Sequence, residues 1–224
     1  MTTNAASADL RAAIVQASRL LFTAGMMSHS GHGNFSARVD DDRFLLTSIG
    51  VVRDLRPEQL ATITFGGDVI DGDLGPENAE IIQMHSVIYK AREEIAAVIH
   101  THSPAATAFA LANRPLPCRT EPLLRFGQSQ PVPVAPWGPR GSGVSVKGIA
   151  TVLAENPGTN AVLLGNHGLL AFGPDPVATG RLVTAIEESA AAELAAAALG
   201  GAADFPQGAL DAVRAEMETR QPGA

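Results

Sequence analysis

The 224-residue sequence predicts a single α/β domain, because helical and strand-like patterns alternate along it without a linker or an internal repeat. Apolar residues make up 46% of the chain and charged residues 17%, a balance that excludes a largely disordered protein. At this length a folded chain buries roughly 70% of its surface, so it can form a stable core on its own. We expect one domain over residues 1–224, with its core at about 8–200 and a tail at 201–224.

The first third of the chain predicts one helix followed by an antiparallel meander. Ser7 is a suitable N-cap, apolar residues recur at helical spacing as far as Leu21, and Gly25 can end the helix. Two hairpins are expected next, the second through the Gly66-Gly67 turn. The four strand-like runs are 35–39, 44–48, 60–65 and 68–70.

The remaining two thirds predict helices alternating with short strands. Prolines near two of the helix starts and a glycine-rich turn between two strands support the assignment. A proline-rich stretch without periodicity is expected to form a long ordered loop, and the last twenty or so residues are expected to fray. In order, the segments are a helix at 78–90, a strand at 96–102, a helix from 104, the loop at 115–143 with a short strand at 132–134, a helix at 145–155, strands at 161–164 and 169–172, and an alanine-rich helix at 176–199.

Charge and cysteine content exclude several classes of protein. The chain has 16 Lys and Arg against 23 Asp and Glu, a net charge of −7, and no basic patch. Such a surface repels nucleic acid and anionic lipid, and no apolar run is long enough to span a membrane. Cys118 is the only cysteine and has no partner for an internal disulfide, which favours a reducing compartment. We therefore expect a cytoplasmic protein that binds neither nucleic acid nor membranes.

Three of the six histidines are placed where they can bind one metal ion. His100 and His102 are two residues apart in the predicted strand, so their side chains leave the same face about 6.5–7 Å apart. His167 lies in a glycine-flanked turn, where backbone segments can approach closely. Three imidazoles with one open position are typical of a catalytic zinc site. The alternative is a pair of half-buried strand histidines hydrogen-bonded to backbone.

Four further polar residues are candidates for the same site. Glu80 stands in the first turn of a predicted helix, where a carboxylate either complements the helix dipole or serves as an acid/base group beside a metal. His85, farther along that helix, either lines the site or packs inside the protein. Asn34 and Ser36 follow glycines and are candidates for holding an anion.

Three blocks of the chain resemble the class II aldolase and adducin family. They are GNFSAR at 33–38, NAEIIQMHSVIYKAREEIAAVIHTHSP at 78–104 and LLGNHGLLAFG at 163–173. The blocks occur in the order expected for the family, and the similarity extends over about residues 8–200. The family includes sugar-phosphate aldolases, an epimerase, a dehydratase, some decarboxylases and the head of adducin.

This resemblance implies a three-layer α/β/α fold around a mainly antiparallel sheet, in a homotetramer with sites at subunit interfaces. It also implies one divalent ion per subunit on His100, His102 and His167, with zinc expected and manganese, iron or cobalt as alternatives. Glu80 matches the family's acid/base glutamate, which also ligates the ion when substrate is absent. Because the adducin head lacks the metal histidines, an enzyme is favoured over a binding module.

The chain departs from the sugar-phosphate aldolases at positions that bind phosphate. Those enzymes resemble T-P-S-G where this chain has T-S-I-G, so Ile49 stands in place of a serine and Ser48 is the remaining candidate contact. They also have S-S-E where this chain has Asn78-Ala79-Glu80, which removes two more hydroxyl donors. A buried phosphate oxygen without a donor costs about 1–3 kcal/mol. A phosphorylated sugar is therefore disfavoured as substrate.

The loop before the 145–155 helix contains two arginines suited to binding a carboxylate. Arg125 and Arg140 each offer a planar fork that can donate two parallel hydrogen bonds to a carboxylate. The segment Trp137–Ser142, WGPRGS, is similar to family members that decarboxylate hydroxylated aromatic dicarboxylates. The alternative is that these arginines form ion pairs between subunits.

We therefore predict a metal-dependent lyase that decarboxylates a hydroxylated aromatic or heteroaromatic dicarboxylate. Glu80 or His85 would protonate the ring carbon, and Arg140 would hold the second carboxylate of this small-molecule substrate. The alternative is a class II aldolase or dehydratase acting on a sugar-like hydroxy-carbonyl compound. A non-enzymatic, adducin-like interaction domain is the third hypothesis. Bound metal together with release of CO2 separates the first hypothesis from the other two.

Overall fold

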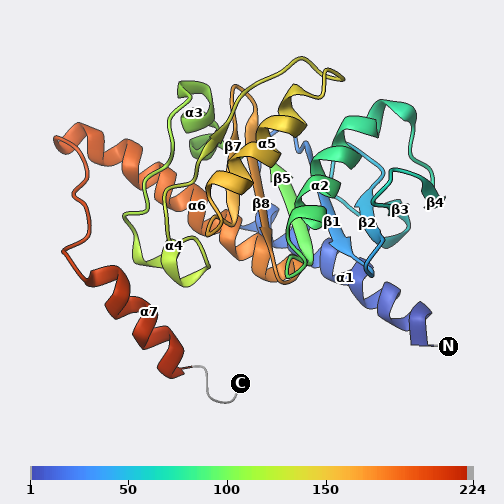
Figure 1. The fold of residues 1–224 in the computed structure, drawn as a ribbon, viewed down its shortest axis with the longest axis horizontal. Helices are drawn as coiled ribbons and strands as arrows, with labels where there is room; N and C mark the ends of the chain where they lie inside the picture. The colour runs from blue at the N-terminus through green and yellow to red at the C-terminus, as the bar shows by residue number, and fades with distance from the viewer. Residues whose placement is uncertain (1, 221–224) are drawn as a thin grey trace.

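The computed structural model describes residues 2–220, in which a mixed sheet lies between two layers of helices (Figure 1). The strands lie in the order β4-β3-β2-β1-β5-β8-β7-β6, and every neighbouring pair is antiparallel except β6 and β7. The strands are β1 (Gly33–Arg38), β2 (Arg43–Thr47), β3 (Leu60–Thr64), β4 (Val69–Asp71), β5 (Ala97–Thr101), β6 (Val134–Ala135), β7 (Ala161–Leu164) and β8 (Gly168–Gly173). The predicted α/β/α fold with a mainly antiparallel sheet is confirmed.

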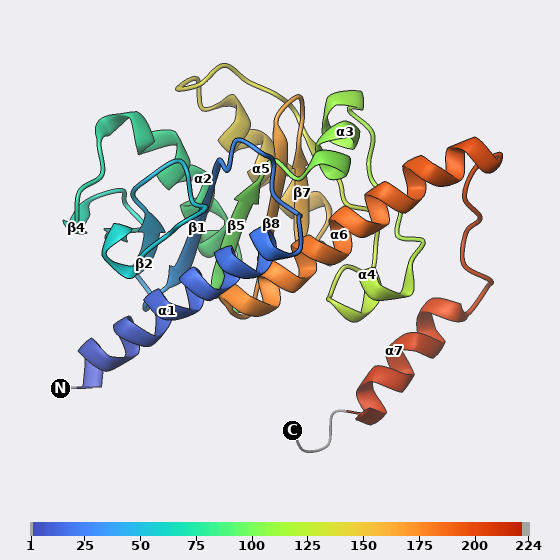
Figure 2. The same ribbon diagram turned by 180° about the vertical axis from the view of Figure 1, so that it is seen from behind.

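The helices divide between the two faces of the sheet. Helices α2 and α5 cover the face seen in Figure 1, whereas α1 and α6 cross the opposite face, seen in Figure 2, together with α3. The helices are α1 (Thr2–Thr23), α2 (Ala79–Ala91), α3 (Pro104–Ala112), α4 (Glu121–Arg125), α5 (Val144–Glu155), α6 (Pro176–Ala196) and α7 (Ala209–Arg220), with short 3-10 helices at Pro57–Gln59, Pro76–Asn78 and Ala197–Leu199. Within residues 2–220, no helix combines the length and apolar character needed to cross a membrane.

Alternation along the strands produces two cores, one on each face of the sheet. In β5, Ile99 packs toward α1 and α6, and Val98 packs toward α2. In β2, Leu45 joins the first core, and Phe44 joins the second. Because successive side chains of a strand point to opposite faces, nearly every residue of a central strand is buried. The two cores enclose the central strands. Of the predicted metal ligands, His100 lies in β5, His102 follows the end of β5, and His167 directly precedes β8.

Two helices differ from the prediction. Helix α1 begins at Thr2 rather than at Ser7; of the residues between them, Ala5 and Ala6 favour a helix. The last twenty or so residues were expected to fray, but as far as residue 220 they form a helix, α7. Helix α7 packs against α4, and Glu216 accepts a hydrogen bond of 2.9 Å from Arg125. Residues 125 and 216 are far apart in the sequence, so no local sequence pattern predicts this contact.

The loop between α3 and α5 is more structured than its composition indicates. It contains the five-residue helix α4 and the two-residue strand β6, which shares only Val134 with the predicted strand at 132–134. Val132 forms an isolated bridge with Leu116 instead, which brings the two ends of the loop's first half together. The loop then continues along the top of the sheet toward α5, over the ends of β5 and β8 (Figure 1).

Candidate active site

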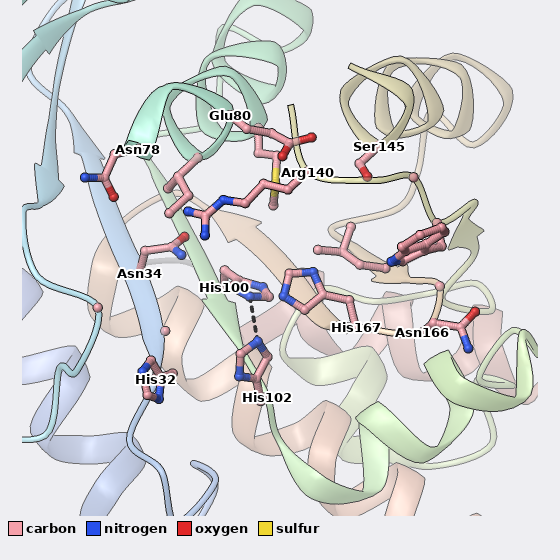
Figure 3. Close-up of a pocket in the computed structure, with 18 of the residues that line it drawn as sticks. His32, Asn34, Asn78, Glu80, His100, His102, Arg140, Ser145, Asn166 and His167 are labelled. Carbon is pink, nitrogen blue, oxygen red and sulfur yellow. Dashed lines mark hydrogen bonds between the residues drawn. The ribbon is translucent and has the colours of Figure 1, made fainter. Parts of the chain in front are cut away.

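A cavity of about 500 Å³ lies at one end of the central strands. Its walls come from the start of β1, the first turn of α2, the end of β5, the β7–β8 turn and the loop before α5. Figure 3 shows three histidines in the middle of this cavity, with two asparagines and an arginine to one side of them. The labelled side chains are those of His32, Asn34, Asn78, Glu80, His100, His102, Arg140, Ser145, Asn166 and His167.

The three predicted metal ligands meet in this cavity. One ligand atom from each of His100, His102 and His167 can be chosen so that all three lie within 4.8 Å of one another. The Nε2 atoms of His100 and His102 are 3.1 Å apart. Two nitrogens bound tetrahedrally at 2.0–2.1 Å to one zinc ion would be separated by about 3.3 Å. The cluster therefore has the donor type and spacing of a three-histidine metal site.

The hydrogen bond made by His100 identifies its metal-binding nitrogen. Its Nδ1 is 2.9 Å from the carbonyl oxygen of Leu169, and a carbonyl can only accept. Nδ1 therefore carries the proton and donates it to Leu169, which leaves the lone pair of Nε2 directed at His102. Such an outer hydrogen bond fixes the tautomer and the ring orientation of a metal-binding histidine. The residues present thus fit a divalent ion.

Burial keeps these imidazoles neutral, as a metal ligand must be. Desolvation lowers the pKa of His102 to about 4, and it lowers the pKa of His100 well below the usual histidine range. The pKa of His167 is also lowered by burial, an effect that the charge of Glu80 partly opposes. Protonation therefore does not compete with metal binding near neutral pH.

Two glycines allow the backbone to approach the metal cluster from both sides of β5. A Cβ atom on Gly168 would lie 2.5 Å from the carbonyl oxygen of Thr101 and 2.9 Å from Cδ2 of His102. On the other neighbouring strand, a Cβ on Gly33 would lie 2.7 Å from the carbonyl oxygen of His100. Any side chain at either position would therefore displace the strand that carries two of the ligands.

Glu80 lies at the α2 side of the cavity, outside the histidine cluster. Its Oε2 accepts a hydrogen bond of 2.8 Å from the backbone N–H of Gly141. Its Oε1 is buried and has no hydrogen-bond partner among the residues that the structure describes. The expected ligation of the ion by Glu80 is thus not prearranged here, whereas one carboxylate oxygen remains available for proton transfer.

Arg140 extends into the cavity from the loop between β6 and α5. Its backbone is next to Gly141, and its Nη2 donates a hydrogen bond of 3.0 Å to the carbonyl oxygen of Glu77. Figure 3 shows the guanidinium between Asn34, Asn78 and His100, so most of its donors face the cavity. Its positive charge contributes to the lowered pKa of His167. This wall of the cavity is therefore suited to an anion.

His85 is buried behind the cavity and does not line it. Its side chain is 0% exposed, and both ring nitrogens are engaged, Nδ1 by Ser36 Oγ at 2.6 Å and Nε2 by Asn34 Oδ1 at 2.6 Å. Burial lowers its pKa to about 3. The single proton of the neutral ring is engaged by a neighbouring side chain, and the ring does not reach the cavity, so the structure does not place His85 where it could protonate a substrate carbon.

Three other candidate substrate contacts also lie outside the cavity. The fork of Arg125 is held by Glu121 and Glu216, so its expected contact with substrate is not formed. Ser48 donates a hydrogen bond of 3.1 Å to the carbonyl oxygen of Gln59. Ser36 is buried beneath Asn34, against His85. Of the predicted contacts, Asn34 and Arg140 do line the cavity.

Several cavity residues were not singled out from the sequence. Asn78 lies beside Arg140, and His32 approaches His102 closely enough that its charge contributes to the lowered pKa of that residue. Trp137, 57% exposed, and Ser145 line the opposite wall. His32 directly precedes the GNFSAR block, and Asn78 is the first residue of the second block. These positions could have identified both as candidate site residues.

The helix that follows His102 is fixed by a buried carboxylate. Glu187 of α6 accepts hydrogen bonds from the backbone N–H groups of Ala105 at 2.7 Å and Ala106 at 2.8 Å. These are two of the unpaired donors in the first turn of α3, which begins at Pro104. Burial raises the pKa of Glu187, although the two N–H groups oppose this shift. This clamp fixes the direction in which the chain leaves the metal cluster.

Comparison with known proteins places this geometry in a family. The model of the family described as class II aldolase and adducin N-terminal domain matches residues 12–194. The chain is similar to 3-oxo-tetronate 4-phosphate decarboxylase of Haemophilus influenzae, with 30% identity over 186 residues that cover 79% of this chain and 83% of that protein. It is also similar to 5-methylthioribulose-1-phosphate/5-deoxyribulose-1-phosphate aldolase of Rhodospirillum rubrum, with 28% identity over 191 residues, or 81% and 78% of the two chains.

Solved structures agree with this comparison at the level of the fold. An L-fuculose 1-phosphate aldolase superposes with a TM-score of 0.78 and 21% identity, covering 94% of this chain and 96% of that one. The structure of an L-fuculose 1-phosphate aldolase from Glaciozyma antarctica gives a TM-score of 0.77 at 25% identity, covering 96% and 83%. The relatives named here have phosphorylated substrates in their names, so these comparisons do not support an aromatic dicarboxylate.

Proposed function

The chain belongs to the class II aldolase and adducin family, and we propose from this premise that it is a metal-dependent carboxy-lyase acting on a small hydroxy-carbonyl acid with a second anionic group. The observation that carries the proposal is the joint placement of three imidazoles, Glu80 and Arg140 around one cavity. An aldolase on a similar compound is the alternative, because cleavage of a carbon–carbon bond next to a carbonyl uses the same groups.

His100, His102 and His167 would hold the ion, for which zinc is our first expectation. A divalent ion there would supply Lewis-acid polarisation of the substrate's carbonyl and hydroxyl oxygens. The protein's own contribution is to keep the three imidazoles neutral and directed at one point, through burial and the hydrogen bond from His100 to Leu169.

Arg140 would bind the second anionic group of the substrate, which stays on the product. Its guanidinium faces the cavity with donors not used by its bond to Glu77, and a fork of this kind binds a carboxylate through two hydrogen bonds. When the carbon–carbon bond breaks, CO2 departs and the bonding electron pair stays on the substrate. Asn34 and Asn78, on the same side of the cavity, would help to hold this second anionic group.

Glu80 would then deliver the proton that replaces CO2. Its Oε1 is buried and unpartnered within residues 2–220, while Oε2 is held by the N–H of Gly141, so the carboxyl group has a fixed orientation. Transfer of a proton from Glu80 to the substrate carbon completes the reaction, and the resulting carboxylate regains a proton from solvent. In the aldolase alternative the same group would move the proton of the aldol hydroxyl.

The proposal is tested by identifying the products of purified protein loaded with zinc, manganese, iron or cobalt in turn. The panel contains 3-oxo-tetronate 4-phosphate, 5-deoxyribulose 1-phosphate and a hydroxylated aromatic dicarboxylate. Metal-dependent release of CO2 from the first compound supports the carboxy-lyase. Formation of an aldehyde from the second compound without CO2 would replace it with the aldolase, and turnover of the third alone would restore our expectation from the sequence.

We also propose that residues 1–224 form one domain of a homotetramer with its sites at subunit interfaces, as the family resemblance implies. We expect a neighbouring subunit to cover the exposed Trp137, which lines the cavity, and the exposed Val144, which directly precedes the cavity residue Ser145 in the chain. Light scattering coupled to size-exclusion chromatography measures the molar mass in solution. A monomer with full activity would contradict this arrangement.

A further inference from the structure

We infer that His85 is a positioning residue that sets the polarity of the anion subsite. A buried hydrogen-bond chain from Tyr89 through Ser36 fixes the proton of His85 on one ring nitrogen, and His85 then orients the Asn34 amide with its NH2 group toward the cavity. This inference deepens the proposed function and rests on it for the nature of the ligand, an anionic oxygen of the substrate. The orientation of Asn34 itself does not depend on which reaction takes place.

The first link in the chain is the contact between His85 and Asn34. His85 Nε2 lies 2.6 Å from Oδ1 of Asn34, and an amide oxygen can only accept. Nε2 therefore carries a proton. His85 is 0% exposed, so the charged imidazolium is strongly disfavoured and the ring is neutral. In a neutral ring with a proton on Nε2, Nδ1 must act as an acceptor.

The second link assigns the donors on the far side of the ring. Ser36 Oγ lies 2.6 Å from His85 Nδ1 and 3.5 Å from the carbonyl oxygen of Val98, so its single proton goes to the nearer acceptor, Nδ1. Ser36 then accepts from the hydroxyl of Tyr89, which is 2.7 Å away. Tyr89 is fully buried, and burial raises its pKa, so the phenol keeps its proton. Every donor along the chain points toward Asn34.

The third link is the effect on the cavity. Because Oδ1 of Asn34 is used by His85, the NH2 group is the part of the amide left for a ligand. Among the residues described, no hydrogen bond to a protein acceptor is made by Nδ2 of Asn34, and Figure 3 shows this side chain directed toward Arg140 and His100. A flipped amide would place two N–H groups against each other. The cavity wall therefore offers donors from both Asn34 and Arg140.

The register of the sheet makes this chain possible. Asn34 is paired with His100 across β1 and β5, and Ser36 is paired with Val98 two residues farther along. Asn34 and Ser36 therefore project from the same face of β1, toward α2, where His85 and Tyr89 are one helical turn apart. One strand pair thus supports the metal ligand and the amide donor at the same level.

Nuclear magnetic resonance of histidine-labelled protein tests the inference without any substrate. We expect the His85 ring to show a proton on Nε2 and none on Nδ1, and to remain in that form from about pH 5 to about pH 8. A proton on Nδ1, or an imidazolium in this range, would overturn the inference. Failure of the proposed reaction would leave this result unaffected, so the two proposals fail separately.

Titration with inorganic phosphate tests the consequence for binding, with the Asn34 side-chain amide as the reporter. We expect its NH2 resonances to move on addition of phosphate to the wild type. In His85→Leu the amide is free to rotate, so phosphate should bind at least about tenfold more weakly, or about 1.4 kcal/mol. Ser189→Ala, which removes a buried hydroxyl bonded to Thr120 far from the cavity, is the matched control and should bind normally.

A second variant keeps the test decisive if His85→Leu does not fold. Asn34→Asp retains the acceptor for His85 but replaces the NH2 group with an oxygen of nearly the same size. We expect phosphate affinity to fall by at least about tenfold and, with a turned-over substrate, KM to rise more than kcat falls. Undiminished phosphate affinity in either folded variant would overturn the inference.

Discussion

The backbone N–H of Gly141 donates a hydrogen bond of 2.8 Å to Oε2 of Glu80, which fastens the glycine-rich loop to the first turn of α2. The preceding residue, Arg140, donates a hydrogen bond to the carbonyl oxygen of Glu77, in the 3-10 helix just before α2. Two neighbouring hydrogen bonds therefore position both Arg140, the proposed anion-binding residue, and Glu80, the proposed proton donor. We expect a substitution of either residue to shift the position of the other.

Loss of one metal ligand should remove the ion. We expect His102→Ala to bind zinc more than about 100-fold more weakly, because removing even an outer-shell partner typically costs 10–100-fold. Metal content after dialysis and calorimetric titration measure the change. His29→Ala, at an exposed histidine outside the cavity, is the matched control. Full metal occupancy in His102→Ala would refute the assignment of the ligands.

Glu80→Gln should retain the fold and the ion but lose most of the activity. The amide oxygen still accepts from Gly141, whereas proton transfer, worth about 10²–10⁴-fold in rate, is lost. Metal content, a thermal unfolding curve and kcat separate these effects. Glu77→Gln, an exposed neighbour in the 3-10 helix just before α2, should keep near-normal kcat. If Glu80→Gln also turns over normally, Glu80 is no more than a charge at the helix end.

Arg140→Lys should weaken binding of the acid substrate by about tenfold, because an ammonium group cannot reproduce the two parallel hydrogen bonds of a guanidinium. The effect should appear mainly in KM for substrates that carry the second anionic group. Arg125→Lys is the matched control, since its fork is occupied by Glu121 and Glu216. Equal losses in the two variants would show that the role of Arg140 is structural.

Acidification should destabilise the protein through His85. Its pKa is about 3 in the folded protein and near 6.5 in the unfolded chain, so between these values only the unfolded chain binds the proton. The free energy of unfolding should therefore fall as pH decreases from about 6.5 toward 3, by about 1.4 kcal/mol per pH unit from this group. Denaturant unfolding of wild type and His85→Leu across this range measures the difference. Parallel pH dependences would contradict the buried neutral imidazole.

Glu187→Gln should destabilise the start of α3. A glutamine offers one acceptor for the two N–H groups of Ala105 and Ala106, so one buried donor loses its partner at a cost of about 1–3 kcal/mol. Chemical denaturation measures the free energy of unfolding. Glu188→Gln, at the next and exposed position of α6, should change it by less than about 0.5 kcal/mol. A neutral Glu187→Gln would show that the clamp contributes nothing to stability.

The sequence was sufficient to predict the fold class and to put His100 and His102 on one face, because strand alternation is a local property. The addition of His167 to this pair rested on the family resemblance, because it depends on the long-range pairing of β5 with β8. The sequence left open whether His85 lines the site beside Glu80 or packs inside the protein, and the structure shows the second. Five residues on a helix correspond to a rotation of about 140°, so the two side chains point in different directions.

The sequence contained one sign that Arg125 is not a substrate contact, because Glu121 stands four residues before it and can pair with it on a helix. Its second partner, Glu216, depends on a tertiary contact that no local pattern predicts.

The two glycines flanking β5 have a consequence for altering this protein by design. Saturation libraries at Gly33 or Gly168 should yield almost only misfolded or metal-free clones, because each new Cβ collides with the backbone that carries the ligands. The cavity residues Trp137, Ser145 and Asn166 have no such constraint from β5. Substrate range should therefore be evolvable from these residues alone, while the β1–β5–β8 side is kept unchanged.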